Sequence, residues 1–421
     1  MELERARPAG RWKQVTAPLQ TWVPVPEGSD FPVQNLPYGV FTPLRGGHPV
    51  GEPRVGVAIG ERVLDLAAIW AGTSLGAALA SGSLNAFLRR GPAEWAYVRD
   101  RVTTLLTTEG ERRLVESNLH RIDEVRLHLP IEVADYVDFY ASENHATNLG
   151  RIFRPNGEAL LPNWKHLPVG YHGRAGTVVV SGTDVRRPSG QRKGPDDAAP
   201  VFGPSVKLDI EAEVGFVVGA GSSLGEAVGV DDFAEHVFGA VLVNDWSARD
   251  VQAWEYVPLG PFLGKSFATS ISAWVVPLAA LEAARVQTPV QLPEPLPYLA
   301  EKQSWGLDLQ IEVDLNGHTV SRPPFAGTYW SPAQMLAHMT VNGASLRTGD
   351  LYASGTVSGT EADQRGSLIE LTWNGRDPLT LPDGSTRTFL EDGDTVTLRA
   401  TAPGADGVRI GFGEVAGTIQ G

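Results

Sequence analysis

Cysteine is absent from the 421-residue sequence. This absence excludes disulfide bonds, thiolate nucleophiles and metal sites with sulfur ligands. No apolar run approaches the roughly 20 residues that a membrane helix needs. The first 14 residues carry charges of both signs and no apolar core, so they are not a secretory signal. We therefore expect a cytoplasmic protein that does not enter a membrane.

Positive charge is also scarce. Lysine and arginine number 35 against 49 acidic residues, which gives a formal charge of -14. This balance argues against a nucleic-acid partner and favours a bound cation. Walker, Rossmann and G-x-S-x-G motifs are missing as well. A hydrolase of this composition would therefore use water made nucleophilic by a histidine or a metal.

Turn-forming residues are abundant, with 47 glycines and 31 prolines spread along the chain. This distribution predicts many short strands. We expect a small β-rich domain over residues 16–124, with a hairpin at 53–69 and helices over 74–119 that break near Gly91-Pro92. A larger β-rich domain should cover 125–421, with strands that include 178–180, 206–218, 239–243, 307–315, 368–373 and 394–400. Residues 1–15 are predicted to be a disordered extension.

Glu211 and Glu213 are the first candidate metal ligands. In a strand, a spacing of two residues puts both carboxylates on one face, with Ile210, Ala212 and Val214 on the other. For an isolated pair, a solvated strand face is the more frequent explanation. Asp245 and Asp138, however, also follow strand-like segments. Four carboxylates without paired histidines indicate a hard cation such as Ca²⁺ or Mg²⁺ rather than Zn²⁺.

His145 lies seven residues after Asp138 and is the candidate general base. A lone histidine is more often structural, and we interpret His166 and His172 in this way. Such a base needs a carboxylate to orient it, and Glu370, in an apolar segment that we predict to be a strand, is the candidate. Glu143, two residues before the base, adds an acidic group whose direction the sequence leaves open.

Residues 244–270 form a third dense segment. Arg249, Gln252 and Lys265 would donate hydrogen bonds to a developing oxyanion. The alternative is that Arg249 and Lys265 only pair with nearby carboxylates. Gly260, Pro261 and Gly264 suggest a loop that approaches a ligand closely.

Five segments together resemble the fumarylacetoacetase family: 138–155, 161–183, 207–219, 244–267 and 353–359. The similarity runs from about residue 29 to residue 417. The family resemblance implies a mainly β fold, with a small N-terminal SH3-like β-barrel and a larger C-terminal β-sandwich roll with a few helices. It also implies a homodimer, a small-molecule substrate and bound Ca²⁺ and Mg²⁺.

The resemblance also implies a role for each matching residue. Ca²⁺ would be held by Asp138, Glu211, Glu213 and Asp245. Mg²⁺ would lie near Asp245, Lys265 and Thr269. The catalytic residues would be His145, Glu370, Arg249, Gln252 and Lys265. The substrate-binding residues would be Tyr140, Arg154, Tyr171, Gln252, Tyr256 and Thr356.

The implied reaction is the metal-dependent hydrolysis of a carbon–carbon bond in 4-fumarylacetoacetate, which gives fumarate and acetoacetate at the end of tyrosine and phenylalanine degradation. One alternative is a related enzyme of the superfamily that acts on another β-diketone or an acylpyruvate as a hydrolase, decarboxylase or isomerase. A second alternative is a non-catalytic metal-binding or interaction module. The alternatives differ in turnover, which a substrate assay measures.

Overall fold

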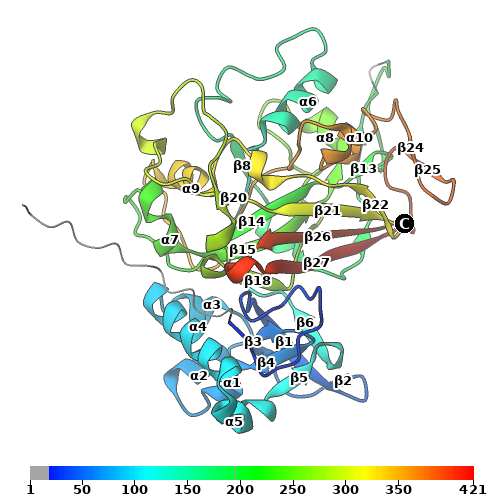
Figure 1. The fold of residues 1–421 in the computed structure, drawn as a ribbon. Helices are drawn as coiled ribbons and strands as arrows, with labels where there is room; N and C mark the ends of the chain where they lie inside the picture. Colours follow the sequence, from blue (N-terminus) through cyan, green and yellow to red (C-terminus); the bar gives the residue numbers. More distant parts are fainter. Residues whose placement is uncertain (1–18, 195) are drawn as a thin grey trace, which may run out of the picture.

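The computed structural model describes residues 19–194 and 196–421, so the extension predicted at 1–15 lies outside the described residues. Figure 1 shows two parts, with the N-terminal segment in blue and cyan below a larger body that holds the rest of the chain. Strands are spread through both parts and helices are few and mostly short. The mainly β fold is confirmed.

The N-terminal part contains a sheet with the order β5-β4-β3-β1, and β6 pairs with the other edge of β1. Within the described chain, no ladder joins β5 to β6, so hydrogen bonding does not close this sheet into a barrel. Strand β6, at residues 125–128, pairs with β1 of this N-terminal sheet. The domain division that we predict at 124/125 stays a prediction. The strands are β1 (Tyr38–Arg45), β2 (His48–Pro49), β3 (Arg54–Ile59), β4 (Arg62–Asp65), β5 (Leu119–Arg121) and β6 (Val125–His128).

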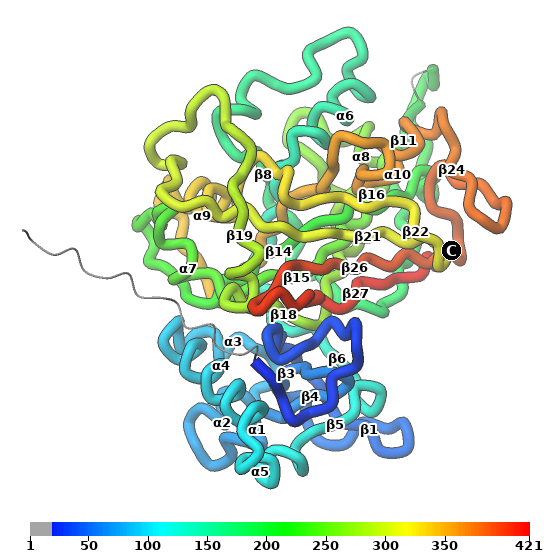
Figure 2. Tube along the Cα trace, in the orientation of Figure 1, coloured from blue at the N-terminus to red at the C-terminus, as the bar shows by residue number. Residues whose placement is uncertain are grey.

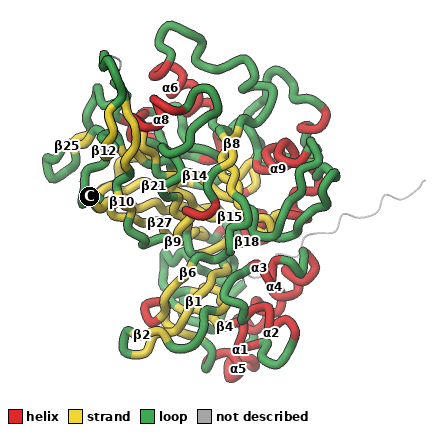
Figure 3. The backbone as a smooth tube through the Cα atoms, turned by 180° about the vertical axis from the view of Figure 1, so that it is seen from behind, coloured by secondary structure: helices red, strands yellow, loops and turns green. Residues whose placement is uncertain are grey.

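Five helices accompany this sheet and gather at one side of it, as Figure 3 shows. The predicted break holds, because the longest helix begins at Pro92 directly after Gly91. Proline suits the first helical turn, where its missing N–H has no partner to lose. The helices are α1 (Leu66–Ile69), α2 (Ser74–Leu79), α3 (Asn85–Leu88), α4 (Pro92–Thr107) and α5 (Arg112–Glu116).

The main sheet of the larger part continues from β1 through β18, β15, β14, β23 and β7 to β8. Its central strand β15 (Val237–Asp245) is buried at every position. Ala240 and Leu242 contribute to one apolar core, while Val241 and Val243 contribute to the other. A strand that is covered on both faces has a nearly continuous run of apolar residues in its sequence. The other strands are β18 (Trp274–Pro277), β14 (Ala212–Val218), β23 (Leu351–Ala353), β7 (Tyr136–Phe139) and β8 (Gly170–His172), with β17 (Thr269–Ile271) beside β15 and β9 (Val178–Val180) beside β17.

A second sheet packs against the first. Its order is β10-β27-β26-β21-β22, and β26 and β27 run across the middle of the molecule in Figure 2. Leu242 of the first sheet and Ile311 and Leu398 of the second share one core. The strands are β10 (Val185–Arg186), β21 (Gln310–Leu315), β22 (His318–Ser321), β26 (Thr395–Pro403) and β27 (Arg409–Gln420).

Short ladders and helices complete the larger part. The paired strands are β11 (Ser189–Arg192) with β12 (Val201–Pro204), β13 (Leu208–Asp209) with β16 (Ser247–Ala248), β19 (Arg285–Val286) with β20 (Gly306–Leu307), and β24 (Leu379–Thr380) with β25 (Thr386–Arg387). The helices are α6 (Glu143–Phe153), α7 (Phe233–His236), α8 (Arg249–Glu255), α9 (Pro332–Thr340) and α10 (Leu368–Leu371). In Figure 1, α6, α8 and α10 lie at the end of the molecule opposite the N-terminal part. None of the described helices is long and apolar enough to cross a membrane.

The predicted strand at 368–373 is wrong. These residues begin with the short helix α10, whose first N–H groups donate to the buried side chain of Asp209. This contact spans 159 residues for Leu368, so a local apolar pattern cannot reveal it. Glu370 therefore projects from a helix rather than from a strand.

Candidate active site

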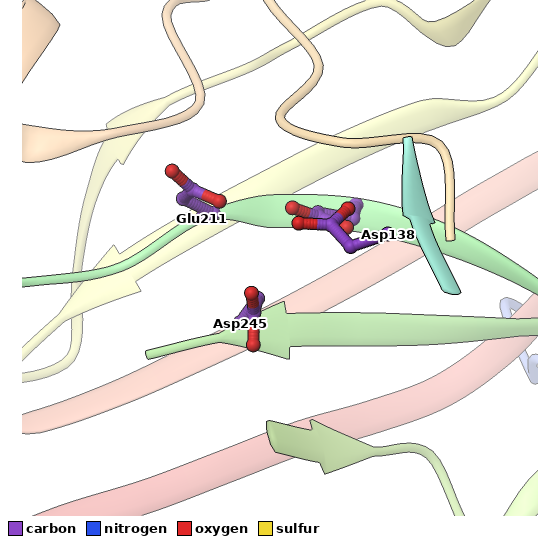
Figure 4. A group of neighbouring side chains, drawn as sticks. Asp138, Glu211 and Asp245 are labelled. Carbon is purple, nitrogen blue, oxygen red and sulfur yellow. The ribbon is translucent and has the colours of Figure 1, made fainter. Parts of the chain in front are cut away.

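Four buried carboxylates meet where three strands of the main sheet end or begin. Asp138 lies in β7, Glu211 just before β14, Glu213 within β14, and Asp245 at the end of β15. Each residue offers an oxygen that lies within 4.8 Å of the others. Figure 4 shows Asp138, Glu211 and Asp245 projecting toward one another from these strands. The structure thus brings the predicted ligand set together.

The strand period explains this convergence. Ala212 pairs with Asn244, which places the two glutamates beside the end of β15. Ile210, Ala212 and Val214 all belong to the apolar core on the opposite face. The prediction that the carboxylates and the apolar side chains lie on opposite faces is confirmed. The alternative of a solvated strand face is wrong for Glu211 and Glu213, because both side chains are buried.

Two positively charged side chains contact the carboxylate cluster. Lys265 Nζ donates to Glu211 Oε2 and lies 3.1 Å from Asp245 Oδ2. Arg249 Nη1 lies 2.7 Å from Glu211 Oε1. Burial raises the pKa of Glu211, but Lys265 and Arg249 outweigh this effect and hold the pKa well below its usual value. Glu211 is therefore ionised, and the lysine and arginine are fixed against it.

The other two carboxylates are not neutralised by the protein. Among the described residues, both oxygens of Glu213 and Oδ1 of Asp138 are buried without a hydrogen-bond partner. Burial raises the pKa of Glu213 well above its usual value, and Asp138 and Glu211 raise it further. Burial likewise raises the pKa of Asp138, which Lys265 opposes. Oxygen atoms in this arrangement fit a hard cation, which would supply the missing positive charge.

The predicted general base and the carboxylate that orients it lie together on the other side of the site. His145 Nδ1 lies 2.7 Å from Glu370 Oε2, and both side chains are buried. A carboxylate only accepts hydrogen bonds, so the proton is on Nδ1 and Nε2 is left as the basic nitrogen. Burial raises the pKa of Glu370, but His145 and its hydrogen bonds hold the pKa below the usual value.

Neighbouring side chains hold both members of this pair. Ser142 caps α6 by accepting a hydrogen bond from the backbone N–H of His145. Helix α6 is not among the elements predicted from the sequence. Three further donors fix the Glu370 carboxylate: Ser358, Ser367 and Asn148, at 3.0, 2.7 and 2.9 Å. The acidic Glu143 turns away to Lys165, at 2.6 Å.

A cavity of about 340 Å³ lies between the carboxylate cluster and the histidine. Within the described ranges, Arg249 Nη2 and Thr356 Oγ1 are buried without a partner, and both residues line the cavity. Leu149, Phe153 and Leu259 provide apolar walls. The remaining predicted site residues on its surface are Asp138, Tyr140, His145, Arg154, Tyr171, Glu211, Gln252, Tyr256 and Lys265.

The tyrosines of the cavity are hydrogen-bond donors. Burial raises the pKa of Tyr140, with a further contribution from Glu370, so the hydroxyl keeps its proton. Burial and Asp138 do the same for Tyr171, whose hydroxyl lies 3.3 Å from Asp245 Oδ2. Arg154 donates to the carbonyl oxygen of Ala159 at 2.8 Å. Tyr256 is more exposed and stands at the opening.

The sequence interpretation missed several residues of this site. Asn148, Ser358 and Ser367 contact Glu370, and no local signal marks them. Asp209 contacts Arg249, and it extends the alternate spacing of Glu211 and Glu213 by one more acidic residue. The three residues predicted for Mg²⁺, Asp245, Lys265 and Thr269, also lie close together. Thr269 Oγ1 donates a hydrogen bond to Asp245 Oδ1 at 2.6 Å.

Two family profiles match the chain. The first, described as fumarylacetoacetate hydrolase C-terminal, matches residues 135–420, and the second, fumarylacetoacetase N-terminal, matches residues 34–130. The human fumarylacetoacetase is 47% identical over 416 residues, which cover 95% of this chain and 98% of that protein. The chain belongs to the fumarylacetoacetase family.

Other members of the fumarylacetoacetase family are similarly related. The fumarylacetoacetase of Arabidopsis thaliana is 47% identical over 419 residues, covering 95% of this chain and 98% of the plant protein. That of Caenorhabditis elegans is 46% identical over 420 residues, covering 95% and 99%. Animal and plant members therefore match this chain almost end to end.

Solved structures share the fold at lower identity. A fumarylacetoacetate hydrolase from Exiguobacterium antarcticum has a TM-score of 0.52 and 17% identity, covering 91% of this chain and 99% of its own. A putative HpcE protein from Mycobacterium smegmatis has a TM-score of 0.52 and 18% identity, covering 90% and 99%. At this identity the similarity shows the fold alone.

The raised pKa values predict how metal-free protein responds to pH. Without a divalent cation, folded Glu213 and Asp138 keep protons that the unfolded chain releases above about pH 4. The folded state then binds more protons at these two groups, so they lower the stability increasingly as pH rises above about 4. Ca²⁺ should restore it by binding only the folded state. Thermal melts with chelator or Ca²⁺ measure both effects.

Glu213→Gln provides the comparison for this pH effect. It should flatten the metal-free dependence and weaken the Ca²⁺-induced rise in Tm, whereas the exposed Glu226→Gln should behave as the parent. If Glu213→Gln and the parent show the same pH slope and the same Ca²⁺ response, the carboxylate cluster is not the cation site.

Proposed function

We propose that this chain hydrolyses 4-fumarylacetoacetate to fumarate and acetoacetate, the last step of tyrosine and phenylalanine degradation. The observation that carries the proposal is that one cavity is lined by His145, oriented by Glu370, and by Lys265 and Arg249, which contact the carboxylate cluster. These groups supply a base and anion stabilisers. Carbon–carbon hydrolysis of a β-diketone needs both.

His145 is the general base in this mechanism. Nε2 takes a proton from water, and the water oxygen adds to the carbonyl carbon of the fumaryl group. Glu370 keeps Nδ1 protonated and stabilises the imidazolium that forms, because its carboxylate is itself held by three side-chain donors. A base oriented in this way contributes roughly 10²- to 10⁴-fold to the rate.

Arg249, Gln252 and Lys265 stabilise the oxyanion of the tetrahedral intermediate. Gln252 uses its Oε1 to accept from Arg249 Nη1 at 3.2 Å, so its amide NH₂ is free to donate. When the bond between the attacked carbonyl carbon and the adjacent CH₂ breaks, the electron pair leaves with the acetoacetyl fragment as an enolate. A proton then completes acetoacetate, and the water oxygen remains on fumarate.

The remaining polar residues of the cavity would bind the substrate's oxygen atoms. Arg154 suits a terminal carboxylate because its guanidinium is planar and always charged. The hydroxyl groups of Tyr140, Tyr171, Tyr256 and Thr356 would donate to further oxygens, and the Thr356 hydroxyl is buried without another partner in the described chain. These contacts would orient a substrate that carries negative charge at both ends.

We further propose that Asp138, Glu211, Glu213 and Asp245 hold Ca²⁺. The unpaired oxygens and the raised pKa values of Glu213 and Asp138 support this assignment. A bound divalent ion polarises diketone oxygens and lowers the energy of negative charge on them. Asp245 and Thr269, with Lys265 beside them, are the candidates for the Mg²⁺ site.

A cytoplasmic homodimer is the assembly that we propose. Its support is an apolar surface around the cavity mouth, formed by exposed side chains of α8, of the loop that follows α8, and of β12. The hairpin β11–β12 reaches α8 through Trp254 Nε1, which lies 3.3 Å from Gln191 Oε1. Exposed apolar patches of this kind mark interfaces. The side chains are Phe202, Trp254, Tyr256, Val257, Leu259, Phe262 and Leu263.

Replacing the base tests the proposed reaction. His145→Ala should lower kcat roughly 10²- to 10⁴-fold while Ca²⁺ still raises the Tm, because the carboxylate cluster is intact. The exposed His166→Ala is the matched control and should turn over normally. Loss of diketone absorbance measures turnover. Near-normal kcat for His145→Ala would exclude the base, and preferred turnover of an acylpyruvate by the parent would exclude the substrate.

A charge placed in the apolar surface tests the dimer. Phe262→Asp should convert the dimer to monomer, because Phe262 is 64% exposed in the single chain. Leu224→Asp, at a residue that is 83% exposed elsewhere, should leave the assembly intact. Sedimentation velocity at micromolar concentration separates the two states. A parent protein that sediments as a monomer would contradict the proposal.

A further inference from the structure

The geometry points to Asp209 as a positioning residue that joins the two halves of the site, the anion-stabilising Arg249 and the short helix that carries Glu370. This inference rests on the proposed function. Asp209 does not line the cavity, so it acts only through the groups that it contacts.

Asp209 is fully buried and accepts four hydrogen bonds from N–H groups. Its Oδ2 accepts from Arg249 Nε at 2.8 Å and from the backbone of Ile369 at 3.0 Å. Its Oδ1 accepts from the backbone of Leu368 at 2.7 Å and of Ile210 at 2.7 Å. Four donors and no competing acceptor require a residue with two acceptor oxygens, which asparagine does not have.

The contact with α10 replaces a local helix cap. The first N–H groups of a helix have no partner within it, and a side chain at the N-cap usually satisfies one of them. Ser367, the N-cap of α10, makes no such bond. Its hydroxyl instead donates to the Glu370 carboxylate at 2.7 Å. Asp209 therefore holds the start of the helix, and Glu370 is the next residue after the two N–H groups that it binds.

The contact with Arg249 fixes the orientation of its guanidinium group. Nε is held by Asp209, and Nη1 is held by Glu211 and Gln252. In the described residues only Nη2 is left without a partner, and Arg249 lines the cavity. Asp209 thus leaves the Nη2 amino group of Arg249 available for a reacting oxygen.

Asp209 is itself held rigidly. It lies in β13, where it pairs with Ser247 of β16, two residues after Asp245 and two before Arg249. On the other side it is two residues before Glu211 in the sequence. One side chain therefore links the metal-ligand strand, the oxyanion donor and the orienter of the base.

Asp209→Asn is the decisive variant because it keeps the shape and removes one acceptor. Its NH₂ would face an N–H group, so either Arg249 or α10 must shift. We expect kcat to fall roughly 10- to 100-fold, the effect of losing a group that orients an active-site residue. KM should change little, because Arg154 and the tyrosines are untouched.

A second readout reports on the base directly. The Nδ1 proton of His145, donated to Glu370, should give a downfield proton resonance that is absent from His145→Ala. In Asp209→Asn this resonance should shift or broaden. In a Glu370→Gln background, adding Asp209→Asn should cost less than it does alone, because the part of its effect that acts through α10 and Glu370 is already lost.

Asp394→Asn is the matched control. Asp394 is also buried and accepts from an arginine, Arg387, and from the backbone of Glu391, but it lies away from the cavity. It should lose stability and keep kcat and the His145 resonance. Asp209→Ser, which keeps one small acceptor for α10, is assayed in parallel in case the asparagine variant does not fold.

The outcomes separate this inference from the proposed function. A folded Asp209→Asn or Asp209→Ser enzyme with parental kcat and an unchanged His145 resonance would overturn the positioning role. If instead the parent does not cleave fumarylacetoacetate, or if His145→Ala is fully active, the proposed function fails. An Asp209→Asn resonance shift with the expected loss of kcat supports the inference.

Discussion

The site is organised around the cost of holding four carboxylates together in the interior. Two unit charges about 4.8 Å apart repel by roughly 3–4 kcal/mol at an effective dielectric constant of about 20, and each also loses hydration on burial. This cost exceeds what surface ion pairs recover, which is about 1 kcal/mol or less. Lys265 and Arg249 neutralise Glu211 and part of Asp245, while Glu213 has no cationic partner among the described residues. A divalent cation would close this deficit.

This constraint accounts for the placement of the neighbouring elements. The strands β7, β14 and β15 are buried on both faces, and the rigid ladder between β14 and β15 keeps the carboxylates apart by a fixed distance. Helix α6 then brings His145 to the opposite wall of the cavity, and helix α10 holds Glu370 against His145 behind that wall. The reacting water would lie between a base on one side and concentrated positive charge on the other. Such preorganised charge is usually the largest contribution to catalysis.

Much of the carboxylate cluster could be predicted from the sequence. The spacing of Glu211 and Glu213 gives their common face by the strand period alone, and Asp245 marks the end of a buried strand. His145 and Glu370 were candidates from their residue types and positions, and the resemblance added the choice of Ca²⁺. The structure brings the four carboxylates, His145 and Glu370 together at one site, while the identity of the ion and the individual roles stay predictions.

The support of the site was not predictable in the same way. Glu370 was placed on the wrong kind of element, because α10 is only four residues long and its start is held by Asp209 from far away in the chain. Ser358, Ser367 and Asn148 reach Glu370 through tertiary contacts that have no sequence period. Helix α6 was missed although two local signals mark it, the N-cap Ser142 and the helical spacing of the buried Ala146, Leu149 and Gly150.

The central claim is that the carboxylate cluster holds one divalent cation in the active protein. A crystal structure of active protein grown with Ca²⁺, at a wavelength where calcium scatters anomalously, tests it most directly. We expect one anomalous peak with oxygens of Asp138, Glu211, Glu213 and Asp245 at about 2.3–2.6 Å. Fully active crystals with no peak there, and with only the Lys265 ammonium among the four carboxylates, would contradict it.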